Sequence, residues 1–194
     1  PDEEVEIGNS GSKDPEEIAC KTSVGLYLFE DNYPYRGDFD FNDAVIQYEI
    51  KDYYQSKNRA KQITVQLMAT GSHMSNSFGF RDSKGFQPFL SGLKGYQNVY
   101  AAQAFEPVGE PVVQTLYGDV VPCLKNESEY YIYPSSFNTA EYPSVLDIPL
   151  SDPDDASWKF GWPQEMQSID NCYWFLKSAS GGSREKDWYK HPKD

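Results

Sequence analysis

Five carboxylates gather in one short window of the sequence, and Arg36 is the only base among them. They are Glu30, Asp31, Asp38, Asp40 and Asp43. Two carboxylates about 4 Å apart near a protein surface repel each other by roughly 4 kcal/mol at an effective dielectric constant of about 20. A fold that brings several of them together therefore needs a cation, protonation or strong hydration to offset the repulsion. Carboxylate oxygens are hard ligands that favour calcium or magnesium over zinc or copper, so we predict a calcium site.

The spacing of the acids suggests how the chain could present them. Asp38, Asp40 and Asn42 alternate with Phe39 and Phe41, so an extended segment would place oxygens on one side and aromatic rings on the other. Asp and Asn also stabilise turns through hydrogen bonds between side chain and backbone. For any single residue that structural role is the better explanation, but for the whole group of acids metal binding is favoured.

An EF-hand loop is the obvious alternative. The D-x-D-x-N spacing at residues 38–42 matches its positions one, three and five, and Glu49 falls at position twelve. Position six, however, is Asp43, where the EF-hand needs a glycine for its sharp bend. Residues 45–50 also indicate a strand, and no helix signal flanks the loop. We therefore reject the EF-hand and keep the oxygen-rich cluster.

Strand-like segments surround the acidic window and would hold it in place. Strands are predicted at residues 23–29 and 44–54, with a turn at 32–37 between them. Another strand, 62–70, alternates apolar and polar residues, and a turn at 57–59 would make it a hairpin partner of 44–54. Four further strands are expected at residues 77–80, 99–105, 112–116 and 129–133.

The composition indicates a single all-β domain. The chain has 194 residues, of which 39% are hydrophobic and 15% aromatic, enough to bury a core. A tyrosine-rich sequence that is interrupted by glycine and proline and has few helical runs is typical of β-sandwiches and barrels. We predict an antiparallel, jelly-roll-like β-sandwich over residues 22–194 with a short C-terminal helix. Residues 1–21 are predicted to form an acidic tail or linker.

The last quarter of the chain carries the predicted helix and all four tryptophans. Ser168 is the expected N-cap and Gly181 the expected end, and the apolar stripe comprises Ile169, Cys172, Tyr173 and Leu176. The tryptophans are Trp158, Trp162, Trp174 and Trp188. Exposed rings could stack on sugars, but we favour a hydrophobic cluster where the helix docks on the sheet.

Charge and cysteine usage exclude several classes of protein. A net charge of −13 argues against nucleic-acid binding and against adhesion to anionic lipid. No membrane-spanning run is visible, and because the chain starts at Pro1 and not at Met, an upstream targeting segment is expected to have been removed. Cys20, Cys123 and Cys172 lack the spacing of a zinc or redox motif, and three buried free thiols are favoured over one disulfide with a leftover thiol.

Few residues suggest catalysis. His73 and His191 are the only histidines and lie far apart in the sequence, and no nucleophile elbow, phosphate-binding loop or dinucleotide fingerprint is present. A carboxylate pair for glycoside hydrolysis stays open because the distance between acids in space is not visible in a sequence. Acids this close together suit metal coordination better, so no enzymatic activity is predicted.

Beyond these residue-level arguments, the chain resembles the LruC domain family from about residue 26 to residue 192. The matching segments are Leu28-Phe-Glu-Asp31 with Pro34, Gly37-Asp-Phe-Asp-Phe-Asn-Asp-Ala-Val45, Gly71-Ser-His-Met-Ser-Asn-Ser-Phe-Gly-Phe80, Asp147-Ile-Pro149, Trp162-Pro-Gln-Glu165, Ser168-Ile-Asp170, Phe175, Ser180-Gly-Gly182 and Asp187-Trp-Tyr189. The chain departs from the family pattern at Cys172 and Trp174, and an insertion at residues 151–156 could form a second, weak cation site.

The resemblance implies a secreted or lipid-anchored protein of the Gram-negative envelope, with the acidic loop as a calcium site. We therefore expect a non-enzymatic calcium-binding domain outside the cytoplasm, at the outer membrane surface or secreted, that serves in attachment or assembly. Its expected partner is an unknown envelope protein or a glycan, and a lipid anchor upstream would be compatible. A carbohydrate-binding module is the alternative, and a glycan-active enzyme is a weaker third.

Overall fold

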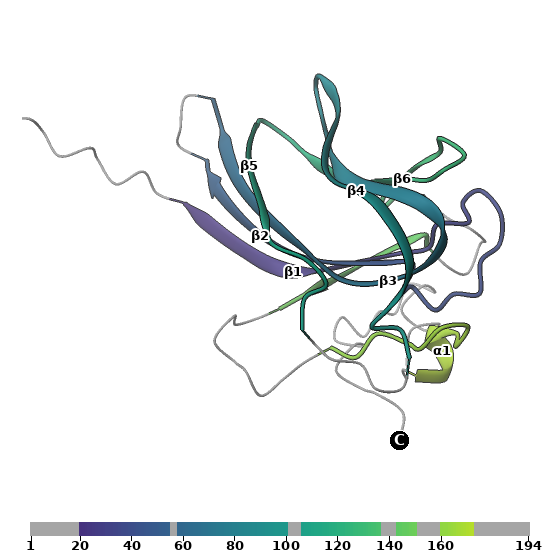
Figure 1. The fold of residues 1–194 in the computed structure, drawn as a ribbon. Coiled ribbons are helices and arrows are strands. Elements are labelled where there is room, and N and C mark those ends of the chain that lie inside the picture. The colour runs from purple at the N-terminus through teal and green to yellow at the C-terminus, as the bar shows by residue number, and fades with distance from the viewer. Residues whose placement is uncertain (1–19, 55–57, 101–105, 137–142, 151–159, 173–194) are drawn as a thin grey trace, which may run out of the picture.

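A computed structural model describes residues 20–54, 58–100, 106–136, 143–150 and 160–172, and shows an antiparallel β fold (Figure 1). The elements are β1 (Lys21–Phe29), β2 (Ala44–Tyr53), β3 (Ala60–Asp82), β4 (Gly85–Gln97), β5 (Val112–Tyr117), β6 (Val121–Lys125), β7 (Tyr131–Ile132), β8 (Val145–Pro149) and α1 (Ile169–Cys172). All strand pairs in these ranges are antiparallel. The prediction of an all-β, antiparallel, sandwich-like fold is therefore confirmed.

The long strand β3 joins the two layers of the fold. Strands pair in the order β7-β6-β3-β2-β1-β8, and β4 and β5 also pair with β3. The first part of β3 pairs with β2 and β5, and its second part pairs with β4 and β6. The pairing of β3 with β4 shifts register between Ser72 and Asn76, between Asn76 and Ser77, and between Phe78 and Gly79. Such irregularities bend a strand, and here the sheet curls over at this point (Figure 1).

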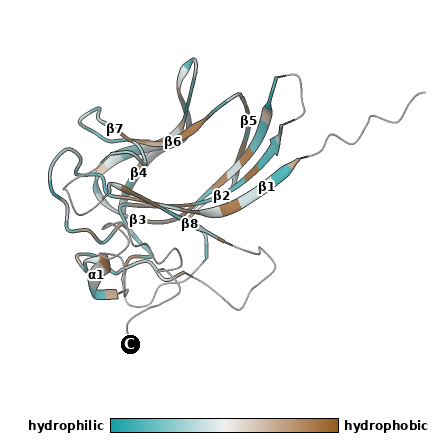
Figure 2. Ribbon diagram, turned by 180° about the vertical axis from the view of Figure 1, so that it is seen from behind, coloured by the Kyte–Doolittle hydropathy of each residue, from teal (hydrophilic) through white to brown (hydrophobic). Residues whose placement is uncertain are grey.

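Two hydrophobic cores lie on opposite faces of the sheet. Alternate residues of β1 enter different cores: Tyr27 and Phe29 contribute to the core inside the curl, whereas Leu26 and Leu28 contribute to the one outside. Alternation of this kind follows from the two-residue period of a strand. Figure 2 shows the result, with apolar colour in the middle of β1 and polar colour at its N-terminal end. The outer core is completed by residues from outside the sheet, namely Phe39, Phe41, Phe160, Trp162 and Ile169.

Several predicted boundaries needed correction. The strands predicted at 62–70 and 77–80 are parts of the single strand β3, and the strand at 129–133 shortens to β7. Strands β4, β6 and β8 were not predicted. In β4, Gly85, Gly92 and Gly95 adopt positive φ angles within a paired strand, and glycines of this kind interrupt the residue pattern of a regular strand.

Other predictions agree with the structure or lie partly outside the described residues. Tyr53 pairs with Ala60 in the β2–β3 hairpin, as the predicted turn between them requires. Residues 99–100 form no strand, and 101–105 lie outside the described part. The predicted helix begins at Ile169, as expected, and its continuation beyond Cys172 is likewise not described.

Candidate cation site

The loop between β1 and β2, residues 30–43, carries all five predicted site residues. Phe29 and Ala44 are direct partners in the two strands, so the loop leaves and returns at neighbouring positions. Glu30 and Asp31 follow β1, and Asp43 precedes β2. The backbone N–H of Asp31 donates to the Asp43 carboxylate at 2.7 Å. Antiparallel pairing therefore brings the acids at the two ends of the loop together.

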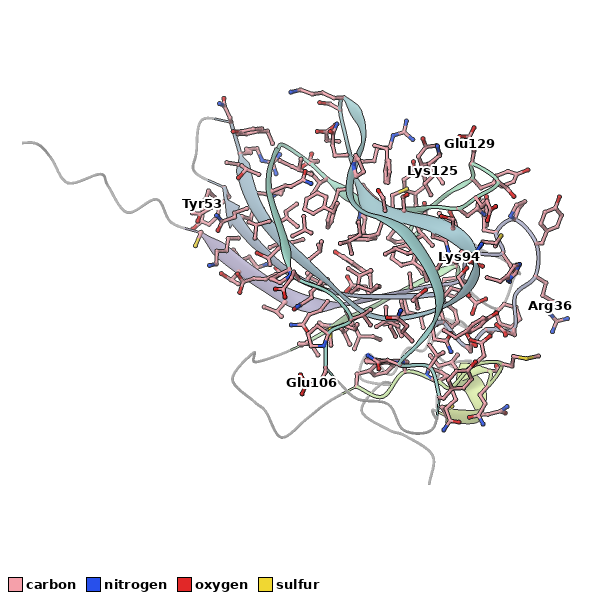
Figure 3. All side chains as sticks on the ribbon, viewed as in Figure 1. Arg36, Tyr53, Lys94, Glu106, Lys125 and Glu129 are labelled. Carbon is pink, nitrogen blue, oxygen red and sulfur yellow. The ribbon has the colours of Figure 1, made fainter. Side chains whose placement is uncertain are left out.

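Three of the five acids form a group that could hold a metal ion. One carboxylate oxygen from each of Glu30, Asp38 and Asp40 lies within 4.8 Å of the others. Glu30 and Asp40 are buried, with 0% and 1% of their surface exposed, whereas Asp38 is exposed and opens the group to solvent. No salt bridge between described residues reaches these acids. Arg36, the base of the loop, points away from the body of the protein (Figure 3) and lies 5.6 Å from the Phe39 ring centre.

Hydrogen bonds fix the two buried carboxylates. Glu30 Oε1 accepts from the Phe41 N–H at 2.8 Å. Asp40 accepts from the N–H of Asn42 at 3.2 Å and from that of Met166 at 2.7 Å. Glu30 Oε2 is buried and has no hydrogen-bond partner among the described residues. The group therefore presents a fixed, buried oxygen that lacks a donor.

The electrostatics of this group favour a cation or a proton. Burial raises the pKa of Glu30 well above its usual value, and the negative charges of Asp40 and Asp38 add to that rise. Burial and the charge of Asp38 also raise the pKa of Asp40 from 3.8 to about 7. Near neutral pH the ionised site is thus costly without a compensating charge.

The loop reaches this geometry through two residues with left-handed backbone and not through the expected extended segment. Phe39 and Phe41 have φ angles of 64° and 54°, a left-handed conformation that is rare for bulky residues. Both rings are buried in the outer core, and Asp40 between them faces Glu30. Burial of the two rings stabilises a backbone that would otherwise be unfavourable, since burying one such side chain contributes roughly 1.5–3 kcal/mol.

Gly37 makes room for the unpaired oxygen of Glu30. A Cβ on Gly37 would lie 1.9 Å from Glu30 Oε2, far inside van der Waals contact. We expect Gly37→Ala to displace the Glu30 carboxylate and to reduce the rise in Tm that calcium causes. Gly109→Ala is the matched control, because a Cβ there meets nothing within 4 Å. Equal calcium responses in the two variants would show that the Glu30 position is unimportant for binding.

Asp31 and Asp43 form a second buried pair beside the group. Asp31 Oδ2 accepts from Asn76 Nδ2 at 2.8 Å and from the Ser72 hydroxyl, both on the irregular part of β3. Burial, together with the charges of Asp31 and Glu30, raises the pKa of Asp43 well above its usual value. The structure thus brings all five acids to one end of the sheet and places three of them around a common point.

Sequence reasoning missed residues that reach the loop from distant parts of the chain. Asn42 Nδ2 donates to the Pro163 carbonyl at 3.0 Å, and the Ile169 N–H donates to the Phe39 carbonyl at 2.8 Å. Glu165 lies within electrostatic reach of Asp38 and Asp31. Figures 1 and 2 show α1 and the loop at the same end of the sheet. From the sequence, Trp162 was expected in a hydrophobic cluster, and Pro163 and Glu165 were singled out only by the family resemblance, without a role.

The remaining residues singled out in the sequence either belong to the core, lie nearer the surface or fall outside the part of the chain that the structure describes. Trp162 is 3% exposed, and its Nε1 donates to the Asn98 carbonyl at 2.5 Å, so its ring belongs to the core. Of the three cysteines, Cys123 is buried, Cys20 is exposed and Cys172 is half-buried, which corrects the expectation of three buried thiols. The described residues do not include Trp158, Trp174, Trp188, His191 or the acidic insertion 151–156.

Comparisons with known proteins identified no related protein or family. No family model, curated protein or solved structure matches this chain. The resemblance to LruC domains therefore stays an expectation. In the described ranges no helix is both long enough and apolar enough to cross a membrane.

Proposed function

We propose that this chain is a non-enzymatic calcium-binding domain whose β1–β2 loop holds the ion between Glu30, Asp38 and Asp40. The observation that carries the proposal is the buried Glu30 Oε2, which lacks a hydrogen-bond partner among the described residues and lies within 4.8 Å of oxygens from two further carboxylates. A buried acceptor without a donor is strongly unfavourable. A cation at this point would satisfy the oxygen and offset the repulsion between the acids.

The chemistry of the ligands supports calcium over other metals. Calcium takes six to eight oxygens in irregular geometry, whereas magnesium requires a near-ideal octahedron and retains its waters. The group offers carboxylates from a loop, and exposed Asp38 leaves room for water to complete the shell. Neither histidine nor cysteine belongs to it, which argues against zinc.

In this proposal calcium links the loop to the segment at residues 160–172. Asp40 accepts a hydrogen bond from Met166, so an ion bound to Asp40 would also stabilise that contact. By its resemblance to LruC domains, the protein would act outside the cytoplasm in surface attachment or assembly. Its partner there would be an envelope protein or a glycan.

Direct titration of metal-free protein with calcium, by isothermal calorimetry, tests the proposal. Asp40→Asn and Asp38→Asn should each weaken binding, because each removes a ligand charge while keeping the side-chain shape. Glu110→Gln is the control for bulk charge, since Glu110 is exposed and distant in sequence from the loop. If all three substitutions lowered the affinity equally, only the net charge of the chain would matter and the proposed site would be wrong.

A carbohydrate-binding module is the second candidate, and a pair of neighbouring tyrosines favours it, of which Tyr131 is exposed and Tyr133 half-buried. The rings of Tyr131 and Tyr133 lie 6.5 Å apart with 14° between their planes. Phe86 lies beside this pair, with its ring centre 5.6 Å from that of Tyr131. Arg81 donates a hydrogen bond to the Tyr133 hydroxyl at 2.9 Å. Neighbouring parallel rings beside a hydrogen-bond donor could stack on successive sugars.

Affinity electrophoresis in gels that contain neutral or acidic polysaccharides would examine this candidate. Tyr131 is 39% exposed, so Tyr131→Ala should leave Tm nearly unchanged and abolish any retardation by the polysaccharide. Tyr117→Ala, at a 53% exposed ring on β5, should retain it. If none of the polysaccharides retarded the wild-type protein, this candidate would be wrong.

A further inference from the structure

Two buried oxygens from distant parts of the chain converge above Gly71. Asn42 Oδ1 and Glu165 Oε2 are both inaccessible to solvent, and neither has a hydrogen-bond partner among the residues that the structure describes. A Cβ on Gly71 would lie 2.0 Å from Asn42 Oδ1 and 2.6 Å from Glu165 Oε2. Both oxygens therefore approach the same point, and the absence of a side chain at residue 71 leaves that point open to them.

The Asn42 amide lies between two acceptors. Asn42 is 0% exposed, and its Nδ2 donates to the Pro163 carbonyl at 3.0 Å. If the amide were turned over, Nδ2 would face Glu165, but the amide oxygen would then face the Pro163 carbonyl. In either orientation two acceptors meet without a donor between them, and in the structure these two are Asn42 Oδ1 and Glu165 Oε2. Such an arrangement requires either a proton on the carboxylate or a cation.

The surrounding charge is more than one divalent ion can balance. Glu165 joins the five acids of the loop at this end of the sheet, and Asp38 and Asp31 both act on it electrostatically. In the described part of the chain, His73 is the one basic group that acts electrostatically on Glu165, and His73 is exposed to solvent. An ion held by Glu30, Asp38 and Asp40 would leave Asp31 and Asp43 without a countercharge, and would leave Glu165 with His73 alone.

We propose that a second divalent cation, calcium by the nature of its oxygen ligands, binds between Asn42 Oδ1 and Glu165 Oε2. This inference extends the proposed calcium function and rests on it. The second ion would join the β1–β2 loop directly to the segment that precedes α1, beside the hydrogen bond from Met166 to Asp40. The two positions would then share Asp38 as a neighbouring charge.

The number of bound ions provides the test. Calorimetric titration of the full, metal-free chain with calcium should give two ions per chain for the wild type and one for Glu165→Gln. Glu110→Gln, which removes an exposed charge elsewhere, should still bind two. One ion in the wild type, unchanged in Glu165→Gln, would overturn the second position but leave the proposed function intact. Failure of the wild type to bind any calcium would instead overturn the proposed function itself.

Thermal melts of the same variants separate a ligand from a merely structural residue. Glutamine has the shape of glutamate and carries an amide donor, so in metal-free protein Glu165→Gln can supply the missing donor to Asn42 Oδ1. We expect its metal-free Tm to equal or exceed that of the wild type, while its rise in Tm with calcium is smaller. A lower Tm without metal, together with an unchanged calcium response, would show that Glu165 only packs against the loop and would contradict the inference.

Discussion

Millimolar calcium is expected to raise the Tm of the metal-free protein by roughly 5–10 °C. A ligand that binds only the native state adds RT ln(1 + [L]/Kd), which is about 2.7 kcal/mol at a hundredfold excess over Kd. For a chain of this size, 1 kcal/mol corresponds to about 2–4 °C in Tm. Differential scanning fluorimetry of protein first stripped with chelator, then titrated with calcium, measures the shift directly.

Several controls make this result specific. Excess chelator should return the Tm to its metal-free value, and magnesium at the same concentration should have a smaller effect because it fits irregular oxygen sites poorly. Asp40→Asn should abolish most of the response. An identical Tm with and without calcium, in protein shown by elemental analysis to be metal-free at the start, would contradict a structural calcium site.

The metal-free protein is expected to lose stability as the pH rises from about 4 to about 7, which is the second large effect. Burial and the charge of Asp38 raise the pKa of Asp40 to about 7 in the native state, from 3.8, and the pKa values of Glu30 and Asp43 are also raised. Between the unfolded and the folded pKa the native state binds more protons than the unfolded chain. Stability therefore falls with rising pH in this window, by about 1.4 kcal/mol for each unit of pKa shift.

Calcium should reverse this dependence. Protons and calcium compete for the same carboxylates, so the rise in Tm that calcium causes should be largest above pH 7 and should shrink as the acids become protonated. Chemical denaturation at a series of pH values, with chelator or with calcium, measures both slopes. In Asp40→Asn the metal-free slope should be shallower. If the metal-free slopes of the wild type and Asp40→Asn were the same, the buried Asp40 would not be the source of the pH dependence.

The fold class followed from local features of the sequence. Runs of strand-forming residues and turn signals depend only on neighbours along the chain, and they located β1 and β2 within a few residues. Alternation of apolar and polar residues likewise located the first half of β3. These local signals failed at β4, because the positive φ angles of its glycines reflect how the sheet bends, and bending is set by pairing with β3. Local signals therefore gave the class of fold, but they could not show that one strand passes through both layers.

The same distinction applies to the site. The sequence alone determined that five acids lie together, because Glu30, Asp31, Asp38, Asp40 and Asp43 share one loop and repel each other wherever that loop is placed. Only the tertiary structure decided which oxygens share a point, since Phe39 and Phe41 must be buried before Asp40 turns towards Glu30. It also brought Glu165 to Asn42 across 122 intervening residues of the sequence. Contacts of this kind depend on which distant segments pack together. Burial of the outer core determines that packing, and no pattern within either segment does.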